Sequence, residues 1–229
     1  MKIAILDLCI WMPEYQHDQA RFGQVLADWV ARAMPQADLT VLDIGSGTPL
    51  PDPAVYDGFV ISGSEQGVYD DVFWMEPLRQ FLRRARDAAK PLFGVCFGHQ
   101  VMADTFGGKA GKVGPPVIGV RRFEFGAQSA EGFVWHQDQV THLPEGATVI
   151  GRADYCPYAV LAYDFPAMSV QFHPEYTRDY LSTFVRRSRG DALSEEAAQQ
   201  ALSEFAQTEV SPHLFTQELA AFLGRHAGS

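Results

Sequence analysis

Cysteine is scarce in this sequence, and its spacing excludes several kinds of protein. Only three cysteines, Cys9, Cys96 and Cys156, occur among 229 residues, and no two of them are close together. An odd and widely spaced set supplies neither a disulfide framework nor the ligands of a tetrahedral metal site. The sequence therefore predicts a reduced, cytoplasmic protein without a structural metal.

Long apolar stretches and positive charge are also lacking. No segment approaches the roughly 20 apolar residues that cross a bilayer, and the apolar run before Asp7 is too short for the hydrophobic region of a signal peptide. Only 18 Lys and Arg residues stand against 28 Asp and Glu residues, which gives a formal net charge of -10. This charge repels phosphate backbones and anionic lipids at long range. We therefore expect neither a nucleic acid nor a membrane as a partner.

What the sequence does contain is an alternation of short apolar runs with longer helical patterns, which is typical of units built around a parallel sheet. Runs rich in Ile, Val and Phe predict core strands at residues 3–8, 39–44, 58–63, 91–95 and 167–171. Helical patterns cover residues 16–34, 75–89, 97–106 and, with breaks near Gly190 and Pro212, 176–226. The predicted fold class is α/β, a doubly wound and mostly parallel sheet with helices on both faces.

Between residues 109 and 171 the pattern shortens to strands and turns, including predicted strands at 117–125 and 132–135. This segment precedes the last core strand. We interpret it as a strand-rich insertion within a single domain, because no low-complexity linker separates it from the rest of the chain.

Cys96 directly follows an apolar strand and precedes a helix, with Gly94 and Gly98 on either side. A sharp turn from strand to helix pushes such a side chain out above the sheet, as in the Gly-x-Ser-x-Gly elbow, and flanking glycines relieve the crowding. The helix N-terminus adds free backbone N–H groups and a partial positive charge, which favour a thiolate and an oxyanion. A lone cysteine after a strand is more commonly a small buried hydrophobe, but the glycines and the helix start favour a nucleophile.

A cysteine nucleophile needs a base, and His173 lies at the end of another apolar strand. Reactive groups gather at the carboxyl ends of the strands of an open parallel sheet, so Cys96 and His173 can meet across a crevice. Glu175 can reach back and hold the imidazole in the tautomer that leaves its other nitrogen free for the thiol. Spacing alone leaves the choice of His173 among seven histidines open.

Several motifs in this order resemble the glutaminase domain of class I, triad-type glutamine amidotransferases, such as those of guanylate and carbamoyl phosphate synthetases. The motifs are Gly94-x-Cys96-x-Gly98-x-Gln100, Phe172-His173-Pro174-Glu175, Ile61-Ser62-Gly63-Ser64 and Phe106-Gly107-Gly108-Lys109. The resemblance covers roughly residues 1–180 and implies a flavodoxin-like fold. In that family the cysteine attacks the side-chain amide of glutamine, forms a glutamyl thioester and releases ammonia, and water then frees glutamate.

Carried over by position, the resemblance implies that Cys96 is the nucleophile, His173 the acid and base, and Glu175 its partner. It also implies that the backbone N–H groups of Gly63 and Phe97 form an oxyanion hole. Substrate contacts are implied for Ser64, Gln100 and His136. This chemistry needs no metal and no cofactor, and we expect neither.

Other reactive residues are expected to be structural. His99 should point away from the nucleophile along the first helical turn. Cys9 and Cys156 have no glycines on either side and are expected to be core or surface thiols.

We predict a catalytic domain at residues 1–189, most of which the resemblance covers, and a helical extension at residues 190–229 that packs on it and matches no motif of the family. A cap over the pocket, a helix pair that docks a partner, and plain packing all stay open as roles for the extension.

Three functions follow. The first is a stand-alone enzyme that hydrolyses a γ-glutamyl amide bond, of glutamine or of a γ-glutamyl peptide or conjugate, with a small molecule as its substrate. The second is a glutaminase subunit that supplies ammonia to a separate synthetase. The third is a catalytically silent binding or regulatory protein, which an intact triad disfavours.

Overall fold

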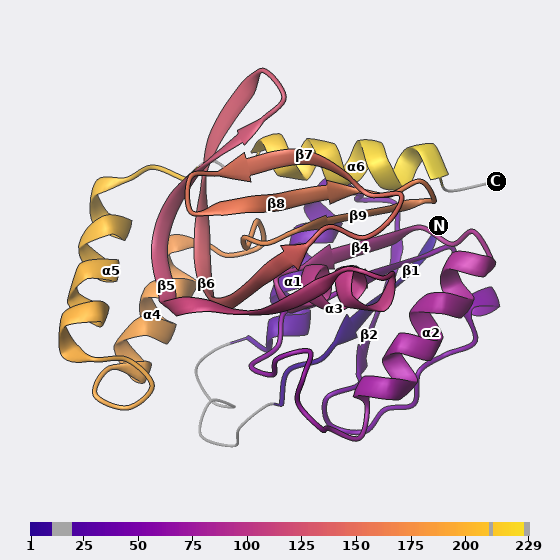
Figure 1. The fold of residues 1–229 in the computed structure, drawn as a ribbon, viewed down its shortest axis with the longest axis horizontal. Coiled ribbons are helices and arrows are strands. Elements are labelled where there is room, and N and C mark those ends of the chain that lie inside the picture. The colour runs from indigo at the N-terminus through magenta and orange to yellow at the C-terminus, as the bar shows by residue number, and fades with distance from the viewer. Residues whose placement is uncertain (11–19, 211–212, 227–229) are drawn as a thin grey trace.

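A parallel sheet lies at the centre of the computed structural model, which describes residues 1–10, 20–210 and 213–226 (Figure 1). Its strands are β1 (Lys2–Asp7), β2 (Asp38–Asp43), β3 (Gly58–Ile61), β4 (Leu92–Val95) and β9 (Ala167–Val170). They lie in the order β2-β1-β3-β4-β9, and each pairs in parallel with its neighbours. The carboxyl ends of all five strands therefore meet at one edge of the sheet, where Cys96 follows β4 and His173 follows β9.

Helices cover both faces of these strands. The two pairs are α1 (Phe22–Ala33) with α6 (His213–His226), and α2 (Met75–Asp87) with α3 (Phe97–Thr105). Along β1, Ile3 and Ile5 belong to the core cluster that contains α1 and α6, whereas Ala4 and Leu6 belong to the cluster that contains α2 and α3. The prediction of a doubly wound α/β sheet with helices on both faces is confirmed.

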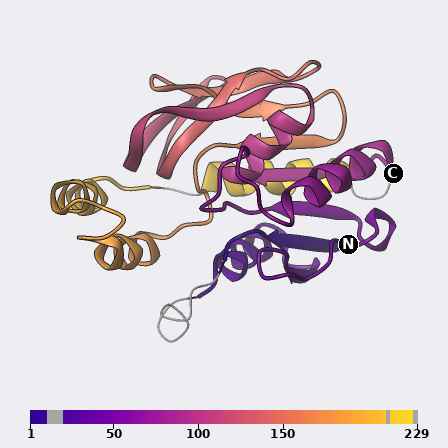
Figure 2. The ribbon, with the colours of Figure 1, turned by 60° about the horizontal axis from the view of Figure 1, so that its bottom comes forward.

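Four antiparallel strands extend the sheet beyond β9. They are β5 (Lys109–Phe125), β6 (Gln128–His142), β7 (Thr148–Ala153) and β8 (Cys156–Ala162), and they continue the order as β9-β8-β7-β5-β6. Figure 2 shows these strands as a layer beside the parallel half. The predicted insertion before the last core strand is confirmed. Its strand at 117–125 was predicted too short, because Pro115 and Pro116 interrupt the pattern where the pairing of β5 with β6 also shifts. Its strand at 132–135 was also predicted too short, because mostly polar residues lie on both sides of that apolar run within β6.

The chain ends in three helices: α4 (Arg178–Ser188), α5 (Glu195–Gln207) and α6. The predicted break near Gly190 is confirmed, since Gly190 has a φ of +79° between α4 and α5, whereas Pro212 lies outside the described residues. α4 and α5 lie side by side at one end of the molecule (Figures 1 and 2). Glu204 of α5 accepts hydrogen bonds from Val120 N (3.0 Å) and Arg121 Nη1 (2.8 Å) of β5. α5 is thereby fixed to the antiparallel strands.

α6 completes the core rather than standing apart from it. Its Phe222 packs on Phe93 of β4, as does Trp29 of α1, and Trp29 Nε1 donates to Thr216 Oγ1 of α6 (2.9 Å). The division at residue 189 stays a prediction. Within the described residues, no helix is long and apolar enough to cross a membrane.

The first helix begins later than its apolar pattern predicts. Of the predicted span 16–34, residues 16–19 lie outside the described residues, and Arg21 is still extended, with φ of -61° and ψ of 150°. α1 therefore starts at Phe22.

Candidate active site

Cys96 occupies a strained turn between β4 and α3. Its φ of +52° and ψ of -104° lie outside the regions that residues with a Cβ normally adopt. The Cys96 N–H donates to Val170 O of β9 (2.8 Å), which ties the turn to the neighbouring strand. Backbone strain of this kind persists only where the surrounding structure imposes it, and it clusters at functional sites. The predicted sharp turn from strand to helix is confirmed.

Gly94 and Gly98 permit this turn because no side chain fits at either position. A Cβ on Gly94 would lie 2.7 Å from the backbone of Gly98 and from Sδ of Met102. A Cβ on Gly98 would lie 2.4 Å from Ile61 O of β3. α3 therefore begins in direct backbone contact with the sheet, with its N-terminus beside the Cys96 thiol.

His173 and Glu175 form a buried pair next to Cys96. His173 Nδ1 lies 2.7 Å from Glu175 Oε1, and both residues are only 4% exposed. The ring of Tyr176 stacks on that of His173, with centroids 4.1 Å apart and planes 4° from parallel. The bond to Glu175 occupies Nδ1 and leaves Nε2 for the cysteine side of the ring. The structure thus brings all three predicted catalytic residues to one cavity of about 420 Å³.

The surroundings of His173 favour its charged form. Burial lowers the pKa of His173, but the charges of Glu175 and Cys96 and hydrogen bonds to both outweigh burial and raise that pKa to about 10. An imidazolium held between a carboxylate and a cysteine can stabilise a thiolate and later donate a proton.

Two backbone N–H groups beside Cys96 are free in the described part of the chain. Neither the Gly63 N–H nor the Phe97 N–H donates a hydrogen bond there. The Ser62 carbonyl on the other side of the Gly63 peptide accepts from Gly98 N (3.0 Å), which fixes this peptide against α3. A Cβ on Gly63 would lie 3.7 Å from Cys96 Cβ. The geometry suits the predicted oxyanion hole, whose role stays a prediction.

The chain after β1 supports the turn that carries Gly63. Leu8 N donates to Ser62 Oγ (2.9 Å), which in turn donates to Gly63 O (2.7 Å). Cys9 Sγ donates to the same carbonyl (3.2 Å), and Ser64 Oγ donates to Leu8 O (3.1 Å). The sequence had pointed to the turn itself but not to this support from residues 8 and 9.

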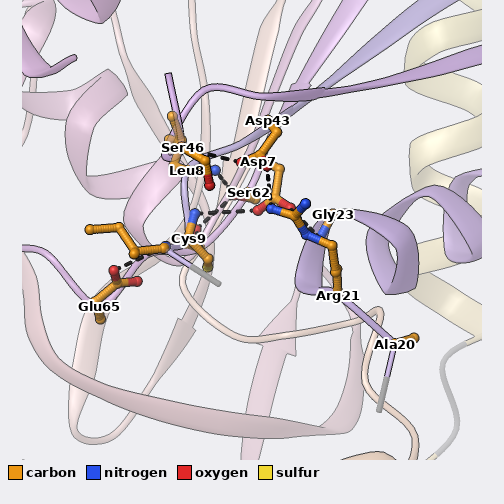
Figure 3. Close-up of polar contacts among 12 residues, drawn as sticks. Asp7, Leu8, Cys9, Ala20, Arg21, Gly23, Asp43, Ser46, Ser62 and Glu65 are labelled. Atoms are coloured by element: carbon orange, nitrogen blue, oxygen red, sulfur yellow. Dashed lines mark hydrogen bonds and ion pairs between the residues drawn. The ribbon is translucent and has the colours of Figure 1, made fainter. Parts of the chain in front are cut away.

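Asp7 joins the same support to the start of α1 (Figure 3). Its buried carboxylate accepts from Gly23 N (3.1 Å) and Cys9 N (3.3 Å), and Arg21 lies 4.0 Å away. Since Arg21, the residue before α1, makes no side-chain cap, Asp7 caps the helix from β1. Burial raises the pKa of Asp7 despite these partners. This role of Asp7 could not be predicted, because an acidic residue at a strand end has no local signature of capping a distant helix.

The three predicted substrate-binding residues, Ser64, Gln100 and His136, line a second cavity of about 210 Å³ that also reaches Cys96. Gln100 Nε2 donates to Asp138 O (2.8 Å). His136 Nδ1 lies within hydrogen-bond distance of Asp138 O (3.0 Å), and its Nε2 lies within hydrogen-bond distance of Tyr155 Oη (3.1 Å). Burial is the main reason that the pKa of His136 falls to about 4. These groups shape the cavity while bonded within the protein, and their binding of substrate stays a prediction.

Gln171 is a further residue at the site that sequence analysis missed. Its Nε2 lies 3.8 Å from Cys96 Sγ as a donor, and its Oε1 accepts from Gln100 Nε2 (3.2 Å). The one available signal was a polar residue between Val170 and Phe172 in an otherwise apolar strand end. The Gln171 amide therefore connects the Cys96 sulfur with the Gln100 side chain.

The remaining reactive residues lie in structural surroundings. His99 is fully buried with Nδ1 2.8 Å from Ser169 Oγ, and burial lowers its pKa to about 3. Cys156 lies in the core cluster that contains β4 and β9. Among the described residues, no group of three or more His, Cys, Asp or Glu is arranged to hold a metal ion.

Comparison with known proteins places the chain in a family. Residues 26–185 match the family model described as glutamine amidotransferase class-I. The chain belongs to this family. The sequence resemblance to class I glutamine amidotransferases is thereby confirmed.

Curated relatives carry two kinds of name. Gamma-glutamyl peptidase 5 of Arabidopsis thaliana is 32% identical over 147 residues, which cover 58% of this chain and 59% of that protein. The glutamine-hydrolyzing GMP synthase of Vibrio vulnificus is 34% identical over 131 residues, which cover 53% of this chain and 24% of that protein. The matched region thus spans less than two thirds of either relative.

Two solved structures share the fold of this class I glutamine amidotransferase chain. A glutamine amidotransferase of Thermotoga maritima has a TM-score of 0.77 at 18% identity and covers 100% of this chain and 98% of its own. A glutamine amido transferase of Methylobacillus flagellatus has a TM-score of 0.76 at 19% identity, and the match covers 98% of this chain and 94% of that protein's chain. At these identities the likeness concerns the fold.

Proposed function

We propose that the chain hydrolyses a γ-glutamyl amide bond through Cys96, His173 and Glu175. The observation that carries this proposal is the strained cysteine elbow facing a His173–Glu175 pair whose Nδ1 and Oε1 are 2.7 Å apart. A nucleophile, a base and a group that orients the base are what acyl transfer through a thioester needs. The names of the γ-glutamyl peptidase relatives support the choice of acyl group.

The reaction runs in two halves. The Cys96 thiolate attacks the γ-carbonyl carbon, and the N–H groups of Gly63 and Phe97 stabilise the oxygen as it becomes negative. The C–N bond then breaks, and His173 gives its proton to the leaving nitrogen while a glutamyl thioester remains on Cys96. A water molecule attacks this thioester and gives a proton to His173. The C–S bond breaks, which releases glutamate and restores the thiolate–imidazolium pair.

Glu175 acts on His173 rather than on the substrate. Its carboxylate fixes the imidazole through Nδ1 and stabilises the imidazolium. We propose a reducing, cytoplasmic setting for this chemistry, because oxidation of Cys96 would remove the nucleophile.

A second candidate is a glutaminase that passes ammonia to a separate synthetase. Similarity to the glutamine-hydrolyzing GMP synthase supports it, since the aligned region is only 24% of that protein. On this reading the chain needs a partner before it turns over glutamine.

One experiment tests the proposal and separates the two candidates. The purified chain is incubated with glutamine, γ-glutamylglycine and glutathione, and released glutamate is measured, with Cys96→Ala as the control. We expect hydrolysis by the chain alone that is absent in the variant. Glutaminase activity that arises only on addition of a co-purifying synthetase would establish the second candidate instead. No glutamate release under either condition would contradict both.

A further inference from the structure

Two cavities of different character meet at Cys96. The larger, of about 420 Å³, also contains His173 and Glu175. The smaller, of about 210 Å³, contains Gln100 and His136, and His173 is not among its described lining residues. We call the larger cavity the aromatic pocket and the smaller cavity the acyl pocket. Besides Cys96, both cavities are lined by Ser64, Glu65, Trp135 and Ala192.

The position of His173 decides which part of a substrate enters which cavity. In the proposed reaction the leaving nitrogen must take its proton from His173, so the leaving amine lies where that imidazole is exposed. That cavity is the aromatic pocket. The glutamyl part then extends into the acyl pocket, where polar side chains predominate.

The aromatic pocket has a continuous wall of rings that starts at His173. Neighbouring ring centroids are 4.1 to 6.0 Å apart, along the series His173, Tyr176, Tyr180, Phe22, Phe184 and Trp135. Rings at such distances provide edge and face contacts for another aromatic group. Ammonia, which is about the size of water at roughly 30 Å³, would contact almost none of this wall.

Charge in the aromatic pocket excludes one class of aromatic leaving group. Its described lining residues include the acidic side chains of Glu65 and Asp191 but neither Lys nor Arg, and the His173 imidazolium in the same lining is already paired with Glu175. A leaving amino acid would bring its own carboxylate toward Glu65 and Asp191 without an unpaired cationic partner, which costs binding energy. An amine without a carboxylate meets no such repulsion.

We infer that the preferred substrates are γ-glutamyl amides of arylalkylamines that carry no carboxylate, with γ-glutamyl-phenethylamide as the representative. The inference rests on the proposed function and specifies its leaving group. Hydrolysis yields glutamate and the free arylalkylamine by the two half-reactions given above.

Two matched substrate pairs test the inference. γ-Glutamyl-phenethylamide differs from γ-glutamyl-ethylamide by the phenyl ring, and from γ-glutamylphenylalanine by the carboxylate. We expect kcat/KM for the phenethylamide to exceed that for the ethylamide at least about 10-fold, as expected for burial of a phenyl ring. We expect it to exceed that for γ-glutamylphenylalanine about fivefold or more, because of the acidic lining.

Variants locate the preference in the aromatic pocket. Phe184→Ala removes a central ring of the wall and should lower the phenethylamide-to-ethylamide ratio of kcat/KM about fivefold. Phe73→Ala is the matched control, because Phe73 is 67% exposed and lines neither cavity. It should leave the ratio unchanged. Asp191→Asn should lower the ratio of kcat/KM for γ-glutamyl-phenethylamide to that for γ-glutamylphenylalanine about twofold.

The outcomes separate this inference from the function on which it rests. Hydrolysis of glutamine and the ethylamide without preference for the phenethylamide would overturn the inference alone. Preference for γ-glutamylphenylalanine over the phenethylamide would overturn the exclusion of carboxylates. A phenethylamide preference that Phe184→Ala and Phe73→Ala change equally would remove the aromatic pocket as its cause. Failure to hydrolyse any γ-glutamyl substrate would overturn the proposed function and the inference together.

Discussion

Replacement of Gly98 by Ala should damage both the fold and the active site. The new Cβ would lie 2.4 Å from Ile61 O, whereas ordinary contact begins at 3.4 Å, so 3.4 - 2.4 = 1.0 Å of separation must be gained. Ile61 O belongs to β3, which is paired on both sides. The first turn of α3 must therefore move and carry Cys96 and the Phe97 N–H with it.

The size of both effects can be estimated. Overpacking against backbone costs about 3 kcal/mol, and the better helix propensity of Ala returns up to about 1 kcal/mol. A net loss of about 2 kcal/mol lowers the Tm by about 4–8 °C in a chain of this length. A shift of about 1 Å at the reacting groups costs about 100-fold in rate.

Gly224→Ala is the matched control, because Gly224 also lies in a helix but has nothing within 4 Å of a Cβ. It should raise the Tm by about 2–4 °C, through a gain of about 1 kcal/mol, and leave activity unchanged. Thermal unfolding followed by circular dichroism and glutamate release from a γ-glutamyl substrate measure the two effects. A Gly98→Ala variant with the Tm and the rate of the wild type would refute the idea that this close approach fixes the elbow.

The remaining predictions concern the catalytic residues. Cys96→Ala and His173→Ala should abolish turnover, whereas Glu175→Ala should leave a measurable remainder because Glu175 only orients and stabilises the imidazolium; near-normal turnover in His173→Ala would mean that the base is wrongly assigned. A diazo ketone or chloroketone analogue of glutamine should label Cys96, as peptide mass spectrometry can show, and labelling confined to Cys9 or Cys156 would contradict the assignment. Although burial lowers the pKa of His173, Glu175 and Cys96 raise it to about 10, so the imidazolium should persist well above pH 7; in Glu175→Gln the largest raising charge is gone, and an NMR titration of the ring should show a lower pKa, whereas an unchanged value would exclude Glu175 as the cause.

Local patterns were sufficient to predict the parallel half of the fold and the elbow. The inner strands β3, β4 and β9 are buried at every position and are therefore almost entirely apolar, whereas the edge strand β2 is only partly buried. The glycines around Cys96 follow from a steric demand of the turn itself, so they can be recognised without the rest of the structure. The position of Glu175 two residues after His173 likewise makes their contact a local matter.

Features that depend on distant segments could not be predicted in the same way. Asp7 caps a helix that begins 15 residues later, at Phe22, and nothing near Asp7 marks that role. The aromatic wall joins α1 to α4 through rings such as those of Phe22 and Phe184. Helical periodicity identifies the apolar side of each helix, but it does not identify which helices meet.

The most direct test of the account is to trap the acyl-enzyme on Cys96. The wild-type chain is mixed with γ-glutamyl-phenethylamide or glutamine, quenched in acid within the first turnovers and digested, and its peptides are examined by mass spectrometry. We predict that the peptide containing Cys96 gains the mass of one glutamyl acyl group, that the adduct is labile to hydroxylamine as a thioester is, and that it is absent in Cys96→Ala. Glutamate release without any adduct on Cys96, or an adduct found only on Cys9 or Cys156, would contradict the account.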